Sequence, residues 1–319
     1  MLDIITFMDT FIAVDVGGTH LRAAVYPKTG IQHITHKKIT TRSAQISAVD
    51  RIIQLITEIW PTDDTVKSIA LAAPGFLNPK TGVVITAPNI DGWENIPLGE
   101  ILKREFGVPV YLGNDANLAA LGEWKFGAAR GHHDVLYLTV STGIGGGVII
   151  ADRLLTGSRG MATELGHITV LPDGPMCGCG HRGHLEAVAS GTAIARDVAA
   201  RLATGEESII ATKNPTTKDI GLAAMKGDLL AISALSIAGQ WIGYTLADFL
   251  HIFDPSIVIF GGGVSQVGSL LLNPVRQGLQ ERILSPEYLK GLTITTAALG
   301  DDAGLLGALA LARTESQTG

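Results

Sequence analysis

Two cysteines, Cys177 and Cys179, are the only thiols in 319 residues, and they stand one residue apart in the stretch GPMCGCGHRGHLE, residues 174–186. A disulfide across a single residue would be strained, so this pairing is not expected. Thiolates and the nearby imidazoles are instead good ligands for a divalent metal. The spacing alone leaves two alternatives open: a metal site, or a loop held by glycine turns without a metal.

Glycine-rich turns that contain threonine or follow a strand form the second group of residues suited to chemistry. The three turns are DVGGTHLR at 15–22, STGIGGG at 141–147 and FGGG at 260–263. Backbone N–H groups without a neighbouring Cβ can approach phosphate oxygens, and Asp15 stands where a carboxylate can hold magnesium through water. One glycine pair predicts only a hairpin turn, but three turns with Thr19 and Thr142 favour a phosphate clamp. No GxxxxGK(S/T) loop is present, and GTHLRA lacks the dinucleotide-binding pattern.

Short apolar strands alternate with helical patterns along the first part of the chain, which indicates an α/β layered domain. We expect strands at 11–16, 21–26, 68–75 and 108–115, and helices at 46–60 and 116–127, the second opened by Asn114 or Asp115. The pattern of strand, Gly/Thr turn and strand returns at 135–152, about 125 residues later. We therefore expect two related domains whose glycine turns face a shared cleft.

The second half of the chain is expected to be mostly helical. Helices are predicted at 186–202, at 229–253, up to about Leu284 and from 301 to 313, with a buried strand within 254–265. Small residues in the last helix, Gly304, Gly307 and Ala308, predict close helix packing. The polar stretch 204–219 is predicted to be a mobile surface segment.

Composition excludes several classes of protein. A net charge of −6 without blocks of like charge gives no reason to expect a nucleic-acid or membrane surface, and a small-molecule partner is expected instead. The first 11 residues lack the basic region of a cleavable signal, and no apolar run is expected to span a membrane. Two cysteines also argue against a disulfide-framed secreted domain, so we expect the cytoplasm.

A series of motifs along the chain resembles the actin-like ATPase superfamily and, within it, the ROK family of sugar kinases and repressors. Seven motifs agree in order: DVGGTHLRAAV, APGFLNPKTGVV, PNIDGW, GNDANLAALGEWKFGA, STGIGGGVI, GHITV and CGCGHRGHLEAVASG. The resemblance runs from about Phe11 to Leu311 and is greatest to the family's glucokinases. It implies two α/β domains of ribonuclease-H-like topology around a central cleft.

The resemblance also implies an ATP-dependent hexose kinase, and its likeness to the glucokinases implies one that converts glucose to glucose 6-phosphate. Asp115 would be the base that accepts the proton of the sugar hydroxyl, a role that suits phosphoryl transfer, in which positioning and charge stabilisation matter most. Capping of the following helix is the alternative role for Asp115. The sugar-binding residues implied are Asn89, Asn114, Asp115, Glu164, His167 and Glu186, a set of amide, carboxylate and imidazole groups suited to sugar hydroxyls. The nucleotide-binding residues implied are Asp15, which would organise Mg²⁺, with Gly17, Gly18, Thr19, Thr142, Gly143, Gly261, Gly262 and Gly263.

In the family a histidine and three cysteines bind a structural zinc ion. Here the third cysteine position is His184, so the implied Zn²⁺ ligands are His167, Cys177, Cys179 and His184. His181 is an alternative ligand. Four protein ligands would leave no open position for water, so the ion would be structural.

The expected domains are 1–115 with 302–319, and 116–301, and the resemblance implies a homodimer. Three alternatives stay open: another hexose, such as an N-acetylhexosamine, mannose or fructose; polyphosphate in place of ATP; and a sugar-sensing regulator or non-sugar actin-like ATPase. Only about ten residues precede the first strand, which leaves no room for a helix-turn-helix domain and argues against a repressor.

Overall fold

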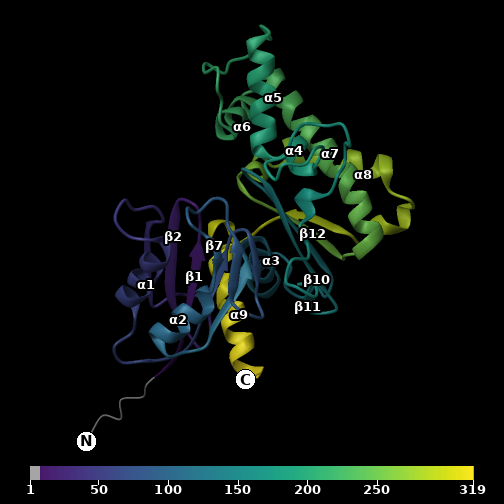
Figure 1. Ribbon diagram of the computed structural model, residues 1–319. Helices are drawn as coiled ribbons and strands as arrows, with labels where there is room; N and C mark the ends of the chain where they lie inside the picture. The colour runs from purple at the N-terminus through teal and green to yellow at the C-terminus, as the bar shows by residue number, and fades with distance from the viewer. Residues whose placement is uncertain (1–7, 319) are drawn as a thin grey trace, which may run out of the picture. The chain divides into compact units, whose positions relative to one another are not determined.

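The computed structural model describes residues 8–318, in two units that each contain one five-stranded sheet (Figure 1). The first unit comprises the chain up to Arg130, Leu154–Ala162 and the chain from Asp301; the second comprises Gly131–Arg153 and Thr163–Gly300. This division differs from the expected boundary at residue 115, because helix α3 (Asp115–Phe126) packs on helix α9 (Ala303–Thr318) and stays with the first unit. The expectation about a signal peptide rests partly on residues 1–7, which lie outside the described part.

The sheet of the first unit has the strand order β3-β2-β1-β4-β8. Its strands are β1 (Asp9–Val16), β2 (His20–Pro27), β3 (Thr35–Thr40), β4 (Thr65–Ala73) and β8 (Val110–Asn114). Strands β1 and β2 are antiparallel, whereas β4 runs parallel to both β1 and β8. A smaller sheet consists of β5 (Phe76–Asn78), β6 (Val83–Thr86) and β7 (Glu94–Ile96). Strand β3 was not expected, because its residues are polar and almost all exposed and so carry no apolar alternation.

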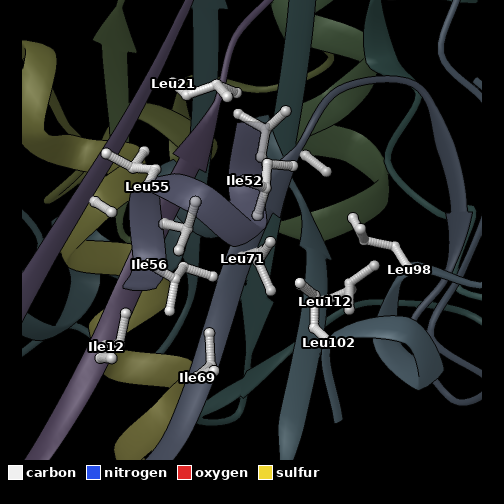
Figure 2. Packing of buried hydrophobic residues seen from close by; sticks show 14 of the residues in the cluster. Ile12, Leu21, Ile52, Leu55, Ile56, Ile69, Leu71, Leu98, Leu102 and Leu112 are labelled. Carbon is white, nitrogen blue, oxygen red and sulfur yellow. The ribbon is translucent and has the colours of Figure 1, made fainter. Parts of the chain in front are cut away.

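Helix α1 (Ala48–Ile59) covers one face of this sheet, and α2 (Leu98–Phe106) lies beside it. Ser47 caps α1 by accepting the N–H of Asp50, as its place before an amphipathic run predicts. Apolar side chains three and four residues apart share one buried side of α1: Ile52, Leu55, Ile56 and Ile59. Figure 2 shows Ile52, Leu55 and Ile56 near strand residues of the same cluster, among them Ile12 and Leu71.

Helices α3 and α9 pack closely against each other, and α9 also lies on β1 and β4. A Cβ atom on Gly307 would stand 1.7 Å from the carbonyl oxygen of Leu118, and one on Gly122 would stand 2.5 Å from that of Ala303. Only glycine fits at either position. The predicted close packing of the last helix is confirmed.

The second unit repeats the topology of the first, with the strand order β11-β10-β9-β12-β13. Its strands are β9 (Val135–Val140), β10 (Ile144–Ile150), β11 (Arg153–Leu154), β12 (Ile257–Gly261) and β13 (Thr293–Thr296). Strands β9 and β10 form an antiparallel hairpin as β1 and β2 do, and β12 runs parallel to β9 as β4 does to β1. The expected duplication is therefore present, and the α/β fold class is confirmed.

Most helices of the second unit follow the expected pattern. They are α4 (Leu185–Ala189), α5 (Gly191–Ala203), α6 (Thr217–Met225), α7 (Leu229–Phe253) and α8 (Ser269–Arg282). The single helix expected at 186–202 is divided at Ser190, which ends α4 and caps α5 by accepting the N–H of Ala193. Short 3-10 turns lie at Leu165–His167, Gly263–Val267 and Pro286–Leu289, and another at Gly300–Asp302 in the chain's return to the first unit.

Helix α7 corrects the expectation that no segment could span a membrane. Its 25 residues include an uncharged run, and by length and composition the helix could cross a membrane. The fold instead gives it protein neighbours: a Cβ on Gly243 would stand 2.2 Å from the carbonyl oxygen of Val275 in α8, and one on Gly239 would stand 2.8 Å from that of Leu271. Just over half of its most apolar window, 56%, is buried inside the second unit. Close packing on α8 accounts for the apolar composition.

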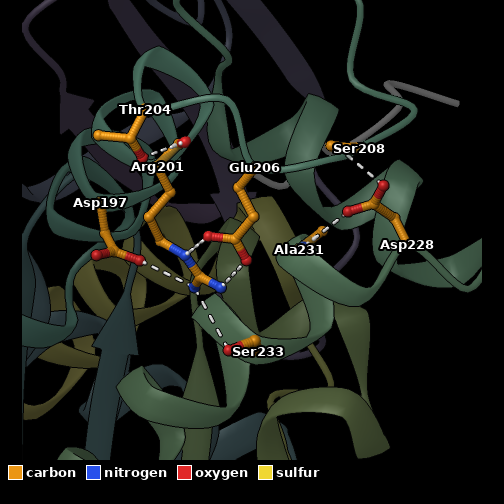
Figure 3. A network of polar contacts seen from close by, with 8 residues as sticks. All are labelled: Asp197, Arg201, Thr204, Glu206, Ser208, Asp228, Ala231 and Ser233. Atoms are coloured by element: carbon orange, nitrogen blue, oxygen red, sulfur yellow. Dashed lines mark hydrogen bonds and ion pairs between the residues drawn. The ribbon is translucent and has the colours of Figure 1, made fainter.

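The polar segment before α6 is largely exposed, as expected, but several contacts hold it (Figure 3). Arg201 pairs with both carboxylate oxygens of Glu206. Asp228, which is 6% exposed, accepts hydrogen bonds from Ser208 Oγ at 2.9 Å and from the N–H of Ile209 at 2.7 Å. Its other oxygen caps α7 by accepting the N–H of Ala231 at 2.8 Å. Asp228 therefore ties this segment to the start of the longest helix.

Asp228→Asn is expected to lower the free energy of unfolding at pH 7 by about 1–3 kcal/mol. Asn can still cap the helix through Oδ1, but an amide NH2 replaces the charged oxygen that accepts from Ser208 and Ile209. Burial raises the pKa of Asp228, but the hydrogen bonds from Ala231, Ile209 and Ser208 outweigh it and lower the pKa below its usual value. A lowered folded pKa stabilises the protein above the unfolded pKa, and this stabilisation is lost as the pH falls through the folded pKa. The free energies of unfolding of the parent and of Asp228→Asn, measured in urea, should therefore become equal at acid pH.

Asp197→Asn is the matched control, because Asp197 belongs to the same network through an exposed pair with Arg201. It should change the free energy of unfolding by less than about 0.5 kcal/mol. Equal effects of the two substitutions would contradict the anchoring role of Asp228.

Candidate functional site

The first glycine turn joins β1 to β2 and is partly satisfied within itself. The N–H of Gly17 donates to the carbonyl oxygen of His20 at 2.9 Å, and the carbonyl oxygen of Gly17 accepts from Thr41 Oγ1 at 2.5 Å. The N–H of Gly17 therefore serves the hairpin, and the amides of Gly18 and Thr19 are the ones left as candidates for a phosphate. A Cβ on Gly18 would stand 3.3 Å from Cβ and from the carbonyl oxygen of Asn89, so this glycine lets the two segments meet.

Asp15, the candidate magnesium residue, is held by an arginine that the motif analysis missed. Arg22 stands opposite Asp15 in the β1–β2 register and pairs with its carboxylate. The same guanidinium bonds the carbonyl oxygen of Asp301 and lies 3.4 Å from the carboxylate of Asp302, at the start of α9. A Cβ on Gly304 would stand 3.2 Å from Asp15 Oδ1. The turn and the start of α9 thus form one charged cluster, whose signal in the sequence was only the hairpin pairing of residues 15 and 22.

Asn114 and Asp115 divide the roles that the sequence left open. Asn114 is the cap of α3: its Oδ1 accepts the N–H groups of Ala116 at 3.0 Å and Asn117 at 3.2 Å, and its Nδ2 donates to the carbonyl oxygen of Gly75 at 3.3 Å. Asp115 is the first residue of α3 and is exposed, with Oδ1 2.8 Å from the N–H of Ala116. The positive end of the helix favours its ionised form. Asn114 is thus the cap residue of α3, and the carboxylate of Asp115 lies exposed directly after it.

The candidate sugar residues are divided between the two units. Asn89, Asn114 and Asp115 belong to the first, whereas Glu164, His167 and Glu186 belong to the second. Within the second unit, Glu164 precedes the 3-10 turn that ends at His167. Burial raises the pKa of Glu164, His167 lowers it and Glu186 raises it further, which places these three side chains in one electrostatic cluster.

The second glycine turn, which joins β9 to β10, lines a cavity of about 560 Å³ within the second unit. Ser141 and Thr142 form one wall, and Gly263 with Val264 after β12 forms another. The remaining wall comes from α6, through Thr217, Lys218, Leu222 and Met225 among others. The α6 residues were missed because their segment reads as polar surface; the signal was the capping box of Thr216 and Asp219.

The three glycines after β12 differ in what they do. A Cβ on Gly261 would stand 2.1 Å from the hydroxyl oxygen of Tyr137, and one on Gly262, where φ is +83°, would stand 2.3 Å from the carbonyl oxygen of Val140. These two residues let the strand end pack. Gly263 alone of the three lines the cavity.

Four side chains of the second unit come together as a candidate metal-binding group: His167, Cys177, Cys179 and His184. One ligand atom from each lies within 4.8 Å of all the others. Cys177 Sγ lies 3.7 Å from His167 Nδ1, and Cys179 Sγ lies 3.2 Å from His184 Nδ1. Ligands in a tetrahedral zinc site stand about 3.5 Å apart, from the usual Zn–S and Zn–N bond lengths. The donor set and its spacing therefore fit zinc.

The protonation states in this group also bear on metal binding. Burial and then the neighbouring His167 lower the pKa of His184, which favours the neutral imidazole that ligates a metal. Burial raises the pKa of the Cys177 thiol to about 11, so a bound cation would have to displace its proton. His181, the alternative ligand, is exposed and stacks on His184 with its ring centroid 5.8 Å away. It is not one of the four convergent ligands.

Known proteins resemble this chain over nearly its whole length. The sequence profile of the ROK family matches residues 11–315. A glucokinase of Streptomyces coelicolor is 38% identical, and the match covers 96% of this chain and 98% of the relative. The solved structure of a ROK family glucokinase from Streptomyces griseus, in complex with glucose and AMPPNP, has a TM-score of 0.81 at 37% identity, covering 96% of this chain and 99% of that one.

A regulator also shares the fold. The structure of a ROK family transcriptional regulator, a homologue of the E. coli MLC protein, has a TM-score of 0.88 at 29% identity, and it is covered over 78% of its length. Kinases and regulators thus both occur among the similar proteins, and the likeness to ROK kinases supports the actin-like α/β fold expected of the chain. With its family profile matched from residue 11 to 315, the chain belongs to the ROK family.

Proposed function

We propose that this protein is an ATP-dependent hexose kinase that phosphorylates glucose. The observation that carries the proposal is the arrangement at the start of α3, where the exposed carboxylate of Asp115 follows the capping Asn114 and would act as the base for the sugar hydroxyl. Glucokinases 36–38% identical over nearly the full length support the activity and the substrate. The regulators are less similar in sequence, which favours the kinase over a sugar sensor.

The remaining site residues have proposed roles that follow from their surroundings. In the second unit, Glu164, His167 and Glu186 would bind sugar hydroxyls. In the first unit, Asn89 and Asn114 would do the same, Asn114 through its remaining amide hydrogen. The cavity lined by Thr142 and Gly263 would take the nucleotide, with the exposed apolar side chains Leu222 and Met225 of α6 suited to the base. Gly143 would let the turn approach phosphates, and Gly18 and Thr19 would do the same in the first unit. Asp15, beside Arg22, would organise Mg²⁺ through water.

We also propose that the Cys₂His₂ group holds a structural zinc ion. Two free cysteines and packing of α7 inside the fold are compatible with action in the cytoplasm, where ATP is available. A homodimer stays a prediction.

The substrate and phosphate donor can be tested directly. Phosphate transfer should be measured for glucose, mannose, fructose and N-acetylglucosamine, each with ATP and with polyphosphate. Glucose with ATP is expected to have the highest kcat/KM. A higher value for another sugar would reassign the substrate, and no transfer to any hexose would favour the regulator.

Asp115→Asn should lower kcat by about 10²- to 10⁴-fold, because the base for the sugar hydroxyl is removed while the side-chain size is kept. The glucose dissociation constant should change by only a few fold, and calorimetry measures it separately from turnover. Asp91→Asn, on an exposed turn of the first unit, is the control and should keep the parental kcat. A kcat for Asp115→Asn within threefold of the parent would contradict the assignment.

Metal analysis of the purified protein should find about one zinc ion per chain, as expected for a tetrahedral site with four protein ligands. His184→Ala should lose the ion and lower the melting temperature, because the loop that the ion holds is released. His181→Ala, its matched control three residues away, should retain the ion. Loss of zinc in the His181 variant with retention in the His184 variant would exchange the roles of the two histidines.

A further inference from the structure

Glu186 belongs to the electrostatic cluster with Glu164 and His167, and it also contacts the second glycine turn. Its Oε2 accepts the N–H of Ile144 at 3.0 Å. A Cβ on Gly143 would stand 2.2 Å from the same oxygen, so the carboxylate lies directly against the turn. This contact involves the turn that lines the 560 Å³ cavity, through Ser141 and Thr142.

The other oxygen of Glu186 faces the metal-binding group. Oε1 lies 3.5 Å from Cys177 Sγ. His184, another of the four ligands, is the N-cap residue of α4, the short helix that carries Glu186 in its first turn. The position of this carboxylate is therefore set by residues that ligate the metal and by the helix they begin.

The start of α5, which follows α4 directly, also holds the second glycine turn through hydrogen bonds. The carbonyl oxygen of Ser141 accepts the N–H of Gly191 at 2.7 Å, and that of Thr142 accepts from Thr192 Oγ1 at 2.8 Å. Gly191 begins α5, directly after α4 ends. Hydrogen bonds thus hold the turn at three residues: α5 contacts residues 141 and 142, and Glu186 of α4 contacts residue 144.

We propose that Glu186 is a positioning residue for the nucleotide, which couples occupancy of the Cys₂His₂ group to nucleotide affinity through its bond to Ile144. The inference rests on the proposed kinase function and extends it. Ordering of the cysteine loop orients the Glu186 carboxylate, and the carboxylate holds the turn in the conformation that lines the cavity. Without the carboxylate, the part-buried N–H of Ile144 loses its acceptor, and the turn must rearrange when nucleotide binds.

Calorimetric titration with Mg-ADP in the absence of sugar tests the proposal without using turnover. Zinc-loaded Glu186→Ala is expected to bind Mg-ADP about fivefold to tenfold more weakly than the zinc-loaded parent, the size of a modest coupling between sites. Glu186→Gln keeps an oxygen that can accept from Ile144 and should restore affinity to within about twofold of the parent, because a neutral acceptor replaces part of the bond. Glu207→Gln is the matched control, an exposed carboxylate of the same unit that does not contact the turn, and should leave nucleotide affinity unchanged.

Removing zinc from the parent and from Glu186→Ala tests whether the metal and Glu186 act through the same contact. Stripping the parent with a chelator, followed by exchange into magnesium buffer, should weaken Mg-ADP binding by about the same factor as Glu186→Ala, and stripping that variant should add less than about twofold, because the coupling residue is already gone. Equal losses on stripping in both proteins, or parental affinity in zinc-loaded Glu186→Ala, would overturn the proposal. The zinc-loaded variants retain the metal. Comparing their Mg-ADP affinities therefore tests the role of Glu186 in nucleotide binding even if a zinc-stripped protein unfolds. Failure of the zinc-loaded parent to bind Mg-ADP would overturn the kinase function itself and the coupling with it.

Discussion

The close crossing of α3 and α9 is the constraint on which the candidate chemistry of the first unit depends. Neither Gly122 nor Gly307 can carry a side chain, because a Cβ would enter the backbone of the facing helix. The contact fixes the start of α3, which carries Asp115, and the start of α9, which follows Asp302. Arg22 contacts Asp302 and also pairs with Asp15. A side chain at the crossing would therefore displace both carboxylates that the proposed reaction needs.

Duplication supplied two similar hairpins, but their turns are stabilised by different means. In the first, the N–H of Gly17 closes the hairpin on His20, and Thr41 secures the carbonyl oxygen. In the second, the N–H of Ser141 donates to the carbonyl oxygen of Gly143 within the turn, and hydrogen bonds from α5 and to Glu186 also hold the backbone from outside. The outside contacts of the second turn come from the helices that follow the cysteine loop, whereas those of the first come from Thr41. This difference is the physical basis for placing a coupling residue in the second unit only.

Local pattern and family resemblance predicted much of this molecule. Apolar periodicity located β1, β4, α1 and α7, and the recurring turn pattern revealed the duplication. Three features escaped for physical reasons. The strand β3 is exposed and polar, so it carries no apolar signal. The α6 wall of the cavity depends on a helix whose sequence resembles a surface loop. The bond from Glu186 to Ile144 joins residues 42 apart, and no local rule encodes which side chain crosses such a distance.

The candidate site also contains features that the sequence predicted and features that it did not. Resemblance named the four metal ligands, and the structure brings them together. Which of Asn114 and Asp115 caps α3 was undetermined from the letters alone, because either side chain can accept a helix N–H. The backbone angles decide it: Asn114 is extended, as a cap residue must be. Domain limits were misjudged at α3 because the packing partner, α9, lies at the other end of the chain.

Histidine at position 184 has a consequence for the charge of the group it joins. A divalent cation bound by two thiolates and two neutral imidazoles forms a cluster without net charge, whereas a third thiolate would leave one negative charge. Cys177 Sγ lies 3.5 Å from Glu186 Oε1, and the carboxylate of Glu164 belongs to the same electrostatic cluster. A neutral metal centre would spare both carboxylates the repulsion that an anionic centre would impose.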